Sequence, residues 1–247
     1  MLQTVWQGFR LTAANWRILF RCLWPIVIPI ILFAAFVLVI KYGFGLDAAA
    51  IKQPNWSAAL RIGLLVVLIW VYFALANGAV LWHRFLVLKE LPPRARIAPV
   101  RGVWRYAALL LLYYIIVGIF GTSWQYALVA NLIVFLLARN WLLLFPHAGV
   151  GRSIKSYRQV QADYQRNAKL AIMVFLSGAL VPYALLGVLD LYEPHARLQY
   201  LVSIAIGAVV LAVQLFCQFS ALTILSVIYE AVAPGEEGVG KRSAMRT

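Results

Sequence analysis

Six stretches of the chain are each apolar for about twenty residues, and no other property of the sequence restricts its fold as strongly. A hydrocarbon core about 30 Å thick needs roughly 20 helical residues to cross it, and only helices or closed barrels satisfy their backbone polar groups there. The stretches are too long and continuous for barrel strands, which alternate. With 64% hydrophobic residues and a mean hydropathy of +0.86, the sequence predicts an all-α integral membrane protein.

We expect six transmembrane helices arranged as three hairpins within a single domain, residues 23–230. The expected spans are 23–42, 59–81, 106–123, 126–145, 170–191 and 198–229. The break between the third and fourth spans rests on the turn signal Gly121-Thr122-Ser123-Trp124, since a single helix of roughly 40 residues would be roughly 60 Å long. Residues 1–22 are expected to form an amphipathic interfacial helix, and residues 231–247 a flexible cytoplasmic tail.

The basic residues predict the orientation. Seventeen of the 22 Lys and Arg residues fall on the side that holds the N-terminus, four fall on the other side, and Arg139 lies inside a span. Because short loops rich in Lys and Arg stay in the cytoplasm, both termini are expected there, in the bacterial inner membrane. The net charge of +14 could also favour nucleic acid, but topology and anionic lipid headgroups explain it better, so we expect no nucleic-acid partner. The candidate lipid contacts are Arg10, Arg17, Arg94, Arg96, Arg101, Arg105, Arg152, Lys155 and Arg158.

Two cytoplasmic segments have the periodicity of amphipathic helices. In the first, apolar residues recur at steps of three and four: Leu2, Val5, Trp6, Phe9, Ala13, Trp16 and Phe20. This helix either lies on the inner leaflet or buttresses the bundle, and both interpretations stay open. A second such helix is expected between the fourth and fifth spans, where Ile154, Tyr157, Gln161, Tyr164 and Ala168 share one face.

Polar residues inside the spans are candidates for function, because they are costly in hydrocarbon and usually face the bundle interior. They are Asn77, Asn131, Arg139, Asn140, Gln214 and Gln218. Gln214 and Gln218 project from one helix face, where they either bond to another helix or contact a substrate, the former being favoured. Arg139 either reaches the cytoplasmic interface with its long side chain or pairs with Glu230 or Asp163.

The sequence contains no recognisable catalytic motif, so we expect neither a catalytic site nor a metal or cofactor. His83 and His147 would lie near the cytoplasmic interface, but no carboxylate or cysteine stands beside either at ligand spacing. Cys22 and Cys217 are too few for a metal cage and too far apart in the expected topology for a disulfide.

A ten-residue passage carries a resemblance to known proteins. Arg139-Asn140-Trp141-Leu142-Leu143-Leu144-Phe145-Pro146-His147-Ala148, followed by Ser153, Tyr157 and Asn167, resembles a pattern in uncharacterised bacterial inner-membrane proteins of the YciC-like type. The same pattern occurs in the membrane domain attached to some glycerophosphodiester phosphodiesterases. Trp82-His83-Arg84-Phe85 also looks like the span exit of the small members. The resemblance implies a six-span bundle without an established activity and transfers no catalytic residue; His147 and Asp163 depart from its pattern.

Three functions are compatible with these observations. The favoured one is an accessory, scaffold or assembly protein that contacts anionic lipid or a membrane complex, with membrane lipids and other membrane proteins as partners. A small-molecule or lipid transporter is the alternative, because each of the three expected hairpins follows a basic segment and such repeats are common in transporters. An intramembrane enzyme that uses His83 or His147 is the second alternative.

Overall fold

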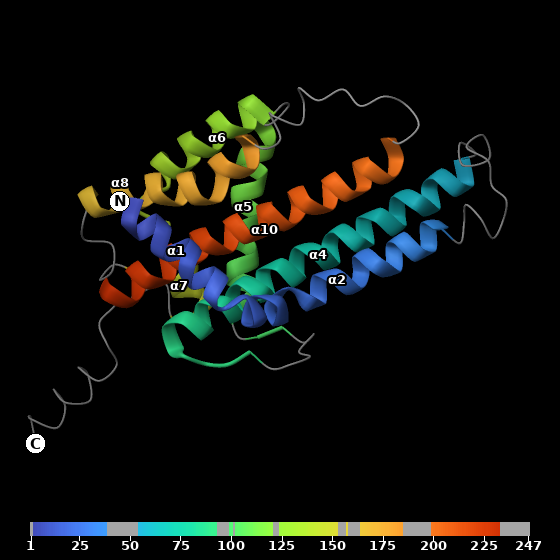
Figure 1. Ribbon diagram of the computed structural model, residues 1–247. Helices are drawn as coiled ribbons and strands as arrows, with labels where there is room; N and C mark the ends of the chain where they lie inside the picture. Colours follow the sequence, from blue (N-terminus) through green and yellow to red (C-terminus); the bar gives the residue numbers. More distant parts are fainter. Residues whose placement is uncertain are drawn as a thin grey trace, which may run out of the picture.

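The computed structural model describes residues 2–38, 54–92, 99–100, 102–120, 124–152, 157, 164–184 and 199–232. All regular elements of this part are helical (Figure 1). They are α1 (Leu2–Ala14), α2 (Trp16–Leu38), α4 (Pro54–Leu88), α5 (Val103–Phe120), α6 (Trp124–Leu137), α7 (Leu144–Gly149), α8 (Tyr164–Phe175), the π-helical turn η3 (Leu176–Leu180) and α10 (Gln199–Val232).

Three of the described segments are long and apolar enough to cross a membrane: Ile62–Leu88, Arg166–Ala184 and Val209–Val232. Two shorter apolar helices, Val103–Ile116 and Gln125–Leu137, lie between them in the sequence. The expectation of an all-helical membrane protein is therefore confirmed in its coarse form. Residues 39–42, 121–123, 185–191 and 198 of the expected spans lie outside the described residues.

The fourth expected span, residues 126–145, differs from the helices observed. α6 ends at Leu137, residues 138–143 form turns, and the six-residue helix α7 follows. Pro146 explains part of this break, because its ring would clash with the carbonyl of Leu142, four residues earlier in a regular helix. The turns instead close at three-residue steps, with Leu144 N donating to Trp141 O at 2.8 Å and Phe145 N to Leu142 O at 3.3 Å.

The expected N-terminal helix is divided at Asn15. The Asn15 side-chain amide donates to Leu11 O at 2.8 Å, and Asn15 O accepts from the backbone N–H of Leu19 at 3.0 Å, which starts α2. An asparagine that bonds to the preceding turn competes with a continuous helix. Residues 16–22 consequently belong to α2.

α1 packs on α10, the last described helix of the chain (Figure 1). Gly8 and Thr12 form the buried face of α1, and Thr12 Oγ1 lies 2.8 Å from Thr223 Oγ1 on α10. Thr223 also accepts a hydrogen bond from the Trp82 indole of α4 at 3.0 Å. One hydroxyl thus joins three helices, and the buttress interpretation of the N-terminal helix is confirmed for this face.

The opposite sides of α1 and early α2 remain outside the bundle. Trp6 is 68% exposed and Trp16 59% exposed, and the guanidinium carbon of Arg17 lies 5.6 Å from the Trp16 ring centroid. A tryptophan beside an arginine suits the boundary between headgroups and hydrocarbon. The inner-leaflet interpretation of this second face stays a prediction.

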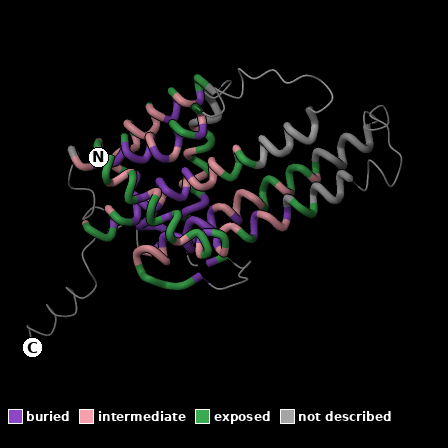
Figure 2. Tube along the Cα trace, in the orientation of Figure 1, coloured by how far each residue is buried: buried purple, intermediate pink, exposed green. Residues whose placement is uncertain are grey.

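The remaining helices pack around two clusters of buried apolar residues, one that includes Leu143, Leu170 and Leu225 and another that includes Cys22, Val80 and Tyr106. α2 and α4 lie side by side, and a Cβ atom on Gly78 of α4 would stand 2.7 Å from the Cys22 carbonyl oxygen of α2. In Figure 1, α5 runs across the direction of α4 and α10, while α6 and α8 lie together on the side away from α2. Buried residues concentrate where α4, α5, α7, α8 and α10 meet, and the part of α4 that leads away from this region is exposed (Figure 2).

We expect Gly8→Leu to detach α1 from α10. A Cβ atom at Gly8 would lie 2.6 Å from Ile224 Cγ1 and 3.2 Å from the Ser220 carbonyl oxygen, so a larger side chain must displace one helix. Overpacking of this kind costs about 1–3 kcal/mol. Thermal unfolding of the detergent-purified protein, followed by circular dichroism, measures the loss. Ala13→Leu, at an exposed position of the same helix, is the control, and equal melting temperatures would contradict the close contact.

Candidate functional site

Asn131 and Asn77, two of the polar residues expected within spans, join neighbouring segments. Asn131 Oδ1 accepts a hydrogen bond from the Tyr113 hydroxyl of α5, while its Nδ2 donates to the Ala127 carbonyl at 2.7 Å and to the Tyr183 hydroxyl at 3.1 Å. Asn77 Oδ1 accepts from the backbone N–H of Val100 at 3.2 Å. These contacts favour the interhelical role over substrate binding.

Asn140 has a similar role beside α7. Its carbonyl oxygen accepts a hydrogen bond from the Tyr157 hydroxyl at 2.6 Å, and its Oδ1 accepts from Asn167 Nδ2 at 3.3 Å. Tyr157 is buried, and burial raises its pKa above the ordinary value, so the hydroxyl stays protonated and donates. Tyr157 is therefore packed within the bundle. Residues 153–156 and 158–163 of the second expected amphipathic helix lie outside the described residues.

The contacts described for Arg139, Gln214 and Gln218 differ. Arg139 Nη1 donates to the Leu136 carbonyl at 3.3 Å, and Glu230, one expected partner, pairs with Lys89 at 3.2 Å. Asp163, the other expected partner, lies outside the described residues. An apolar cavity of about 520 Å³ lies among α4, α5, α6, α8 and α10, and of these three polar residues Gln218 alone contributes to its described lining.

The two candidate histidines are buried and bond to hydroxyl groups. His83 Nδ1 lies 2.6 Å from Ser226 Oγ and His83 Nε2 lies 3.3 Å from the Tyr106 hydroxyl. His147 Nδ1 lies 2.9 Å from the Tyr229 hydroxyl. Both histidines therefore connect their segments to α10. The sequence signal that was missed is the row of hydroxyl residues Ser220, Thr223 and Ser226, spaced three residues apart on α10.

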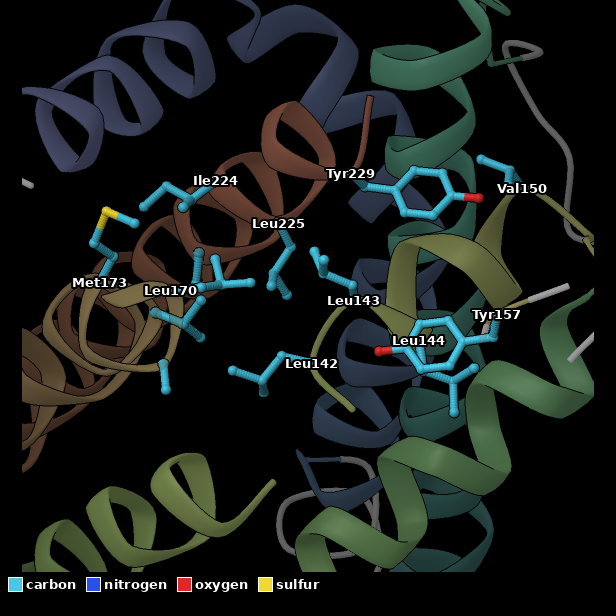
Figure 3. Packing of buried hydrophobic residues seen from close by; sticks show 13 residues of the cluster. Leu142, Leu143, Leu144, Val150, Tyr157, Leu170, Met173, Ile224, Leu225 and Tyr229 are labelled. Carbon is cyan, nitrogen blue, oxygen red and sulfur yellow. The ribbon is translucent and has the colours of Figure 1, made fainter. Parts of the chain in front are cut away.

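α7 is held firmly in the bundle. All of its residues except Phe145 are buried, and leucines 142–144 pack against α8 and α10 (Figure 3). Phe145 packs edge-on against Tyr106 of α5. After α7 the chain turns at Gly151, whose φ of +80° is readily adopted by glycine. This turn brings Arg152 back toward the bundle, and Arg152 N donates to the His147 carbonyl at 3.2 Å.

Three arginines gather at this turn, and we call them the arginine cluster: Arg84, Arg105 and Arg152. Arg105 Nη1 donates to the Arg152 carbonyl at 3.4 Å. Arg84 Nη1 would stand 3.9 Å from a Cβ atom on Gly151. The guanidinium carbon of Arg152 lies 5.8 Å from the Tyr229 ring centroid. Arginines from α4 and α5 therefore reach the turn after α7 that carries Arg152, and Arg84 is the member that the sequence candidates lacked.

The other candidate lipid contacts are only partly visible. Arg10 and Arg17 are exposed on α1 and early α2. The remaining candidates lie outside the described residues: Arg94, Arg96, Arg101, Lys155 and Arg158. In the sequence, the first three lie between Arg84 and Arg105, and the last two follow Arg152.

No family model, curated protein or solved structure matches the chain. The resemblance to YciC-like proteins stays a prediction, and the site has to be interpreted from its own chemistry.

We expect Asn131→Leu to destabilise the bundle by about 1–2 kcal/mol, because the substitution removes from α6 the partner of the Tyr113 and Tyr183 hydroxyls. Thermal unfolding in detergent measures this loss. Gln125→Leu removes an amide from an exposed position of the same helix and should leave the melting temperature unchanged. A melting temperature for Asn131→Leu that equals that of the control would contradict the interhelical role.

Proposed function

We propose that the chain is a non-enzymatic protein of the bacterial inner membrane that binds anionic lipid headgroups at its cytoplasmic end. There it acts as an accessory, scaffold or assembly protein. We further propose six spans in three hairpins, with both termini in the cytoplasm. The observation that carries the proposal is the arginine cluster at the Gly151 turn.

The charges around the cluster do not balance within the described residues. Arg84 is paired with Glu90, at 2.7 Å from Nε and 2.9 Å from Nη2. Lys89 is paired with Glu230, and these two glutamates are the acidic residues of the described part of the chain. Arg105 and Arg152 thus have no acidic partner among the described residues, and this excess of positive charge favours a bound anion.

A lipid phosphate is an anion well suited to this position. Guanidinium groups bind phosphate through paired, charge-assisted hydrogen bonds, and basic pockets between helices on the cytoplasmic side bind anionic headgroups. The exposed Trp6 and Trp16, beside Arg10 and Arg17, support a headgroup-level position for the same end of the molecule.

Two other functions have weaker support. Transport of a polar solute calls for polar groups around a common cavity, whereas Asn77, Asn131 and Asn140 bond between segments. Catalysis calls for a reactive group that substrate can reach, whereas His83 and His147 are buried against hydroxyls of α10.

We expect the double variant Arg105→Gln/Arg152→Gln to bind phosphatidylglycerol about 25-fold more weakly than the unaltered protein, because each cation near the headgroups contributes about 1 kcal/mol. Native mass spectrometry of the detergent-purified protein, titrated with phosphatidylglycerol or phosphatidylcholine, measures this affinity. Lys169→Gln removes one charge from an exposed position of α8 and is the control. If the double variant and the control bind phosphatidylglycerol alike, the cluster is not the headgroup site.

The topology predicts opposite results for two reporter fusions. A fusion at Asp47, between the first two expected spans, should report the periplasm, because this short segment carries few cations. A fusion at Thr247 should report the cytoplasm. Alkaline phosphatase and green fluorescent protein, each fused at both positions, distinguish the two compartments. Reporters that are active in the same compartment would contradict an even number of spans.

A further inference from the structure

The apolar cavity is a second site, apart from the proposed headgroup site. It measures about 520 Å³, within the range of roughly 300–1,000 Å³ that is usual for ligand pockets. Its wall includes Leu110 of α5, Val134 of α6 and Leu225 of α10. Leu142, Leu144 and Leu225, which Figure 3 shows within the cluster around α7, form one end of the wall.

The tyrosine and glutamine side chains of the wall already have partners in the protein. The Tyr106 hydroxyl lies 3.3 Å from His83 Nε2, and the Tyr113 hydroxyl donates to Asn131 Oδ1. The Tyr114 hydroxyl and the Gln218 side chain bond to each other. A polar or charged occupant would lose its water without gaining these groups as partners, so the wall selects an apolar occupant.

The cavity opens at the outer surface of the bundle. Leu112 and Trp141 both contribute to the wall and are 56% and 55% exposed. Leu112 belongs to an apolar helix, and Trp141 belongs to the turns before α7, where its indole suits the level of the headgroups. An occupant can therefore enter sideways from the hydrocarbon, beside Trp141.

One wall is built around an irregular helical turn. Gly178 contributes to the lining and lies within the π-helical turn η3, and a Cβ atom there would stand 3.0 Å from Ala221 Cβ of α10. Ser177 Oγ of this turn donates to the Met173 carbonyl of α8 at 2.8 Å. π-Helical turns are rare and occur frequently at functional sites. The π-helical turn is an observation independent of the cavity's shape, and it also indicates a functional site at the cavity wall.

We infer that this cavity holds one hydrocarbon chain of a membrane phospholipid. The site goes beyond the proposed headgroup binding and does not depend on it, since none of the three cluster arginines contributes to the described wall. The protein would thereby recognise lipid by two separate features, the charge of the headgroup and the apolar chain.

The test uses the full chain in phosphatidylcholine vesicles that contain a phospholipid with a diazirine near the end of one acyl chain. After irradiation, mass spectrometry of the digested protein locates the crosslinks. We expect crosslinks on inward residues such as Leu110 and Leu225. Val134→Trp fills the cavity and should reduce these crosslinks about tenfold, which corresponds to about 1.4 kcal/mol of binding free energy.

The neighbouring Ile133 provides a matched control, because it is exposed on the same helix and does not line the cavity. Ile133→Trp should leave the inward crosslinks unchanged. Ala138→Phe fills the cavity from another position and replaces Val134→Trp if circular dichroism shows that the latter is unfolded. Crosslinks confined to outward residues, or equal inward yields for the filled and control variants, would overturn the inference.

A second probe distinguishes the source of the chain. The probe is a diazirine-labelled fatty alcohol. If the alcohol labels the inward residues and the phospholipid does not, the cavity binds a free apolar molecule, and the inference of a phospholipid chain is overturned. Loss of the chain crosslinks with unchanged phosphatidylglycerol affinity would leave the proposed headgroup site intact, so the two proposals fail separately.

Discussion

The arrangement of the other helices depends on the contacts that hold α7 in the bundle. A helix of six residues leaves most of its backbone polar groups without intrahelical partners, so it is stable only when the surrounding protein holds it in place. His147 bonds to α10, Phe145 packs on α5, and Gly149 stands against the His83 ring of α4. The same contacts set the direction of the following turn and therefore the position of Arg152. Fold and proposed headgroup site therefore rest on one set of contacts.

Much of the helical content could be read from the sequence, but its interruptions could not. Apolar runs indicate helices because the bilayer admits few alternatives, and α5 and α10 follow the runs closely, while α4 extends beyond its expected span at both ends. The break after Leu137 falls at Arg139 and Asn140, which were interpreted as polar residues inside a continuous span, and Pro146 marks only the far end of the break. The periodicity of residues 2–20 likewise missed the division at Asn15. It also missed the docking face, because close helix contacts use small residues such as Gly8, not the large apolar residues that define the periodic stripe.

For the candidate site, the sequence predicted which types of residue take part but not which residues contact one another. Hydropathy identified Asn77, Asn131 and Asn140 as polar residues inside spans, but their partners lie 17 to 52 residues away, and nothing in a single sequence fixes such pairs. Counting cations predicted a basic side, whereas the convergence of Arg84, Arg105 and Arg152 depends on the turn at Gly151. The cavity had no signal at all, since residues that face lipid and residues that face a cavity are equally apolar.

The bond between Thr12 and Thr223 spans 211 residues and has a consequence for biogenesis. The ribosome releases α1 well before α10 exists, so α1 has to wait beside the inserted spans until its docking partner arrives. During this interval its glycine face is uncovered, and the indole of Trp82 lacks the threonine to which it will donate. Completion of the bundle is thus a late, long-range event in synthesis, and a chain truncated ahead of α10 would leave its earliest helix without a place to bind.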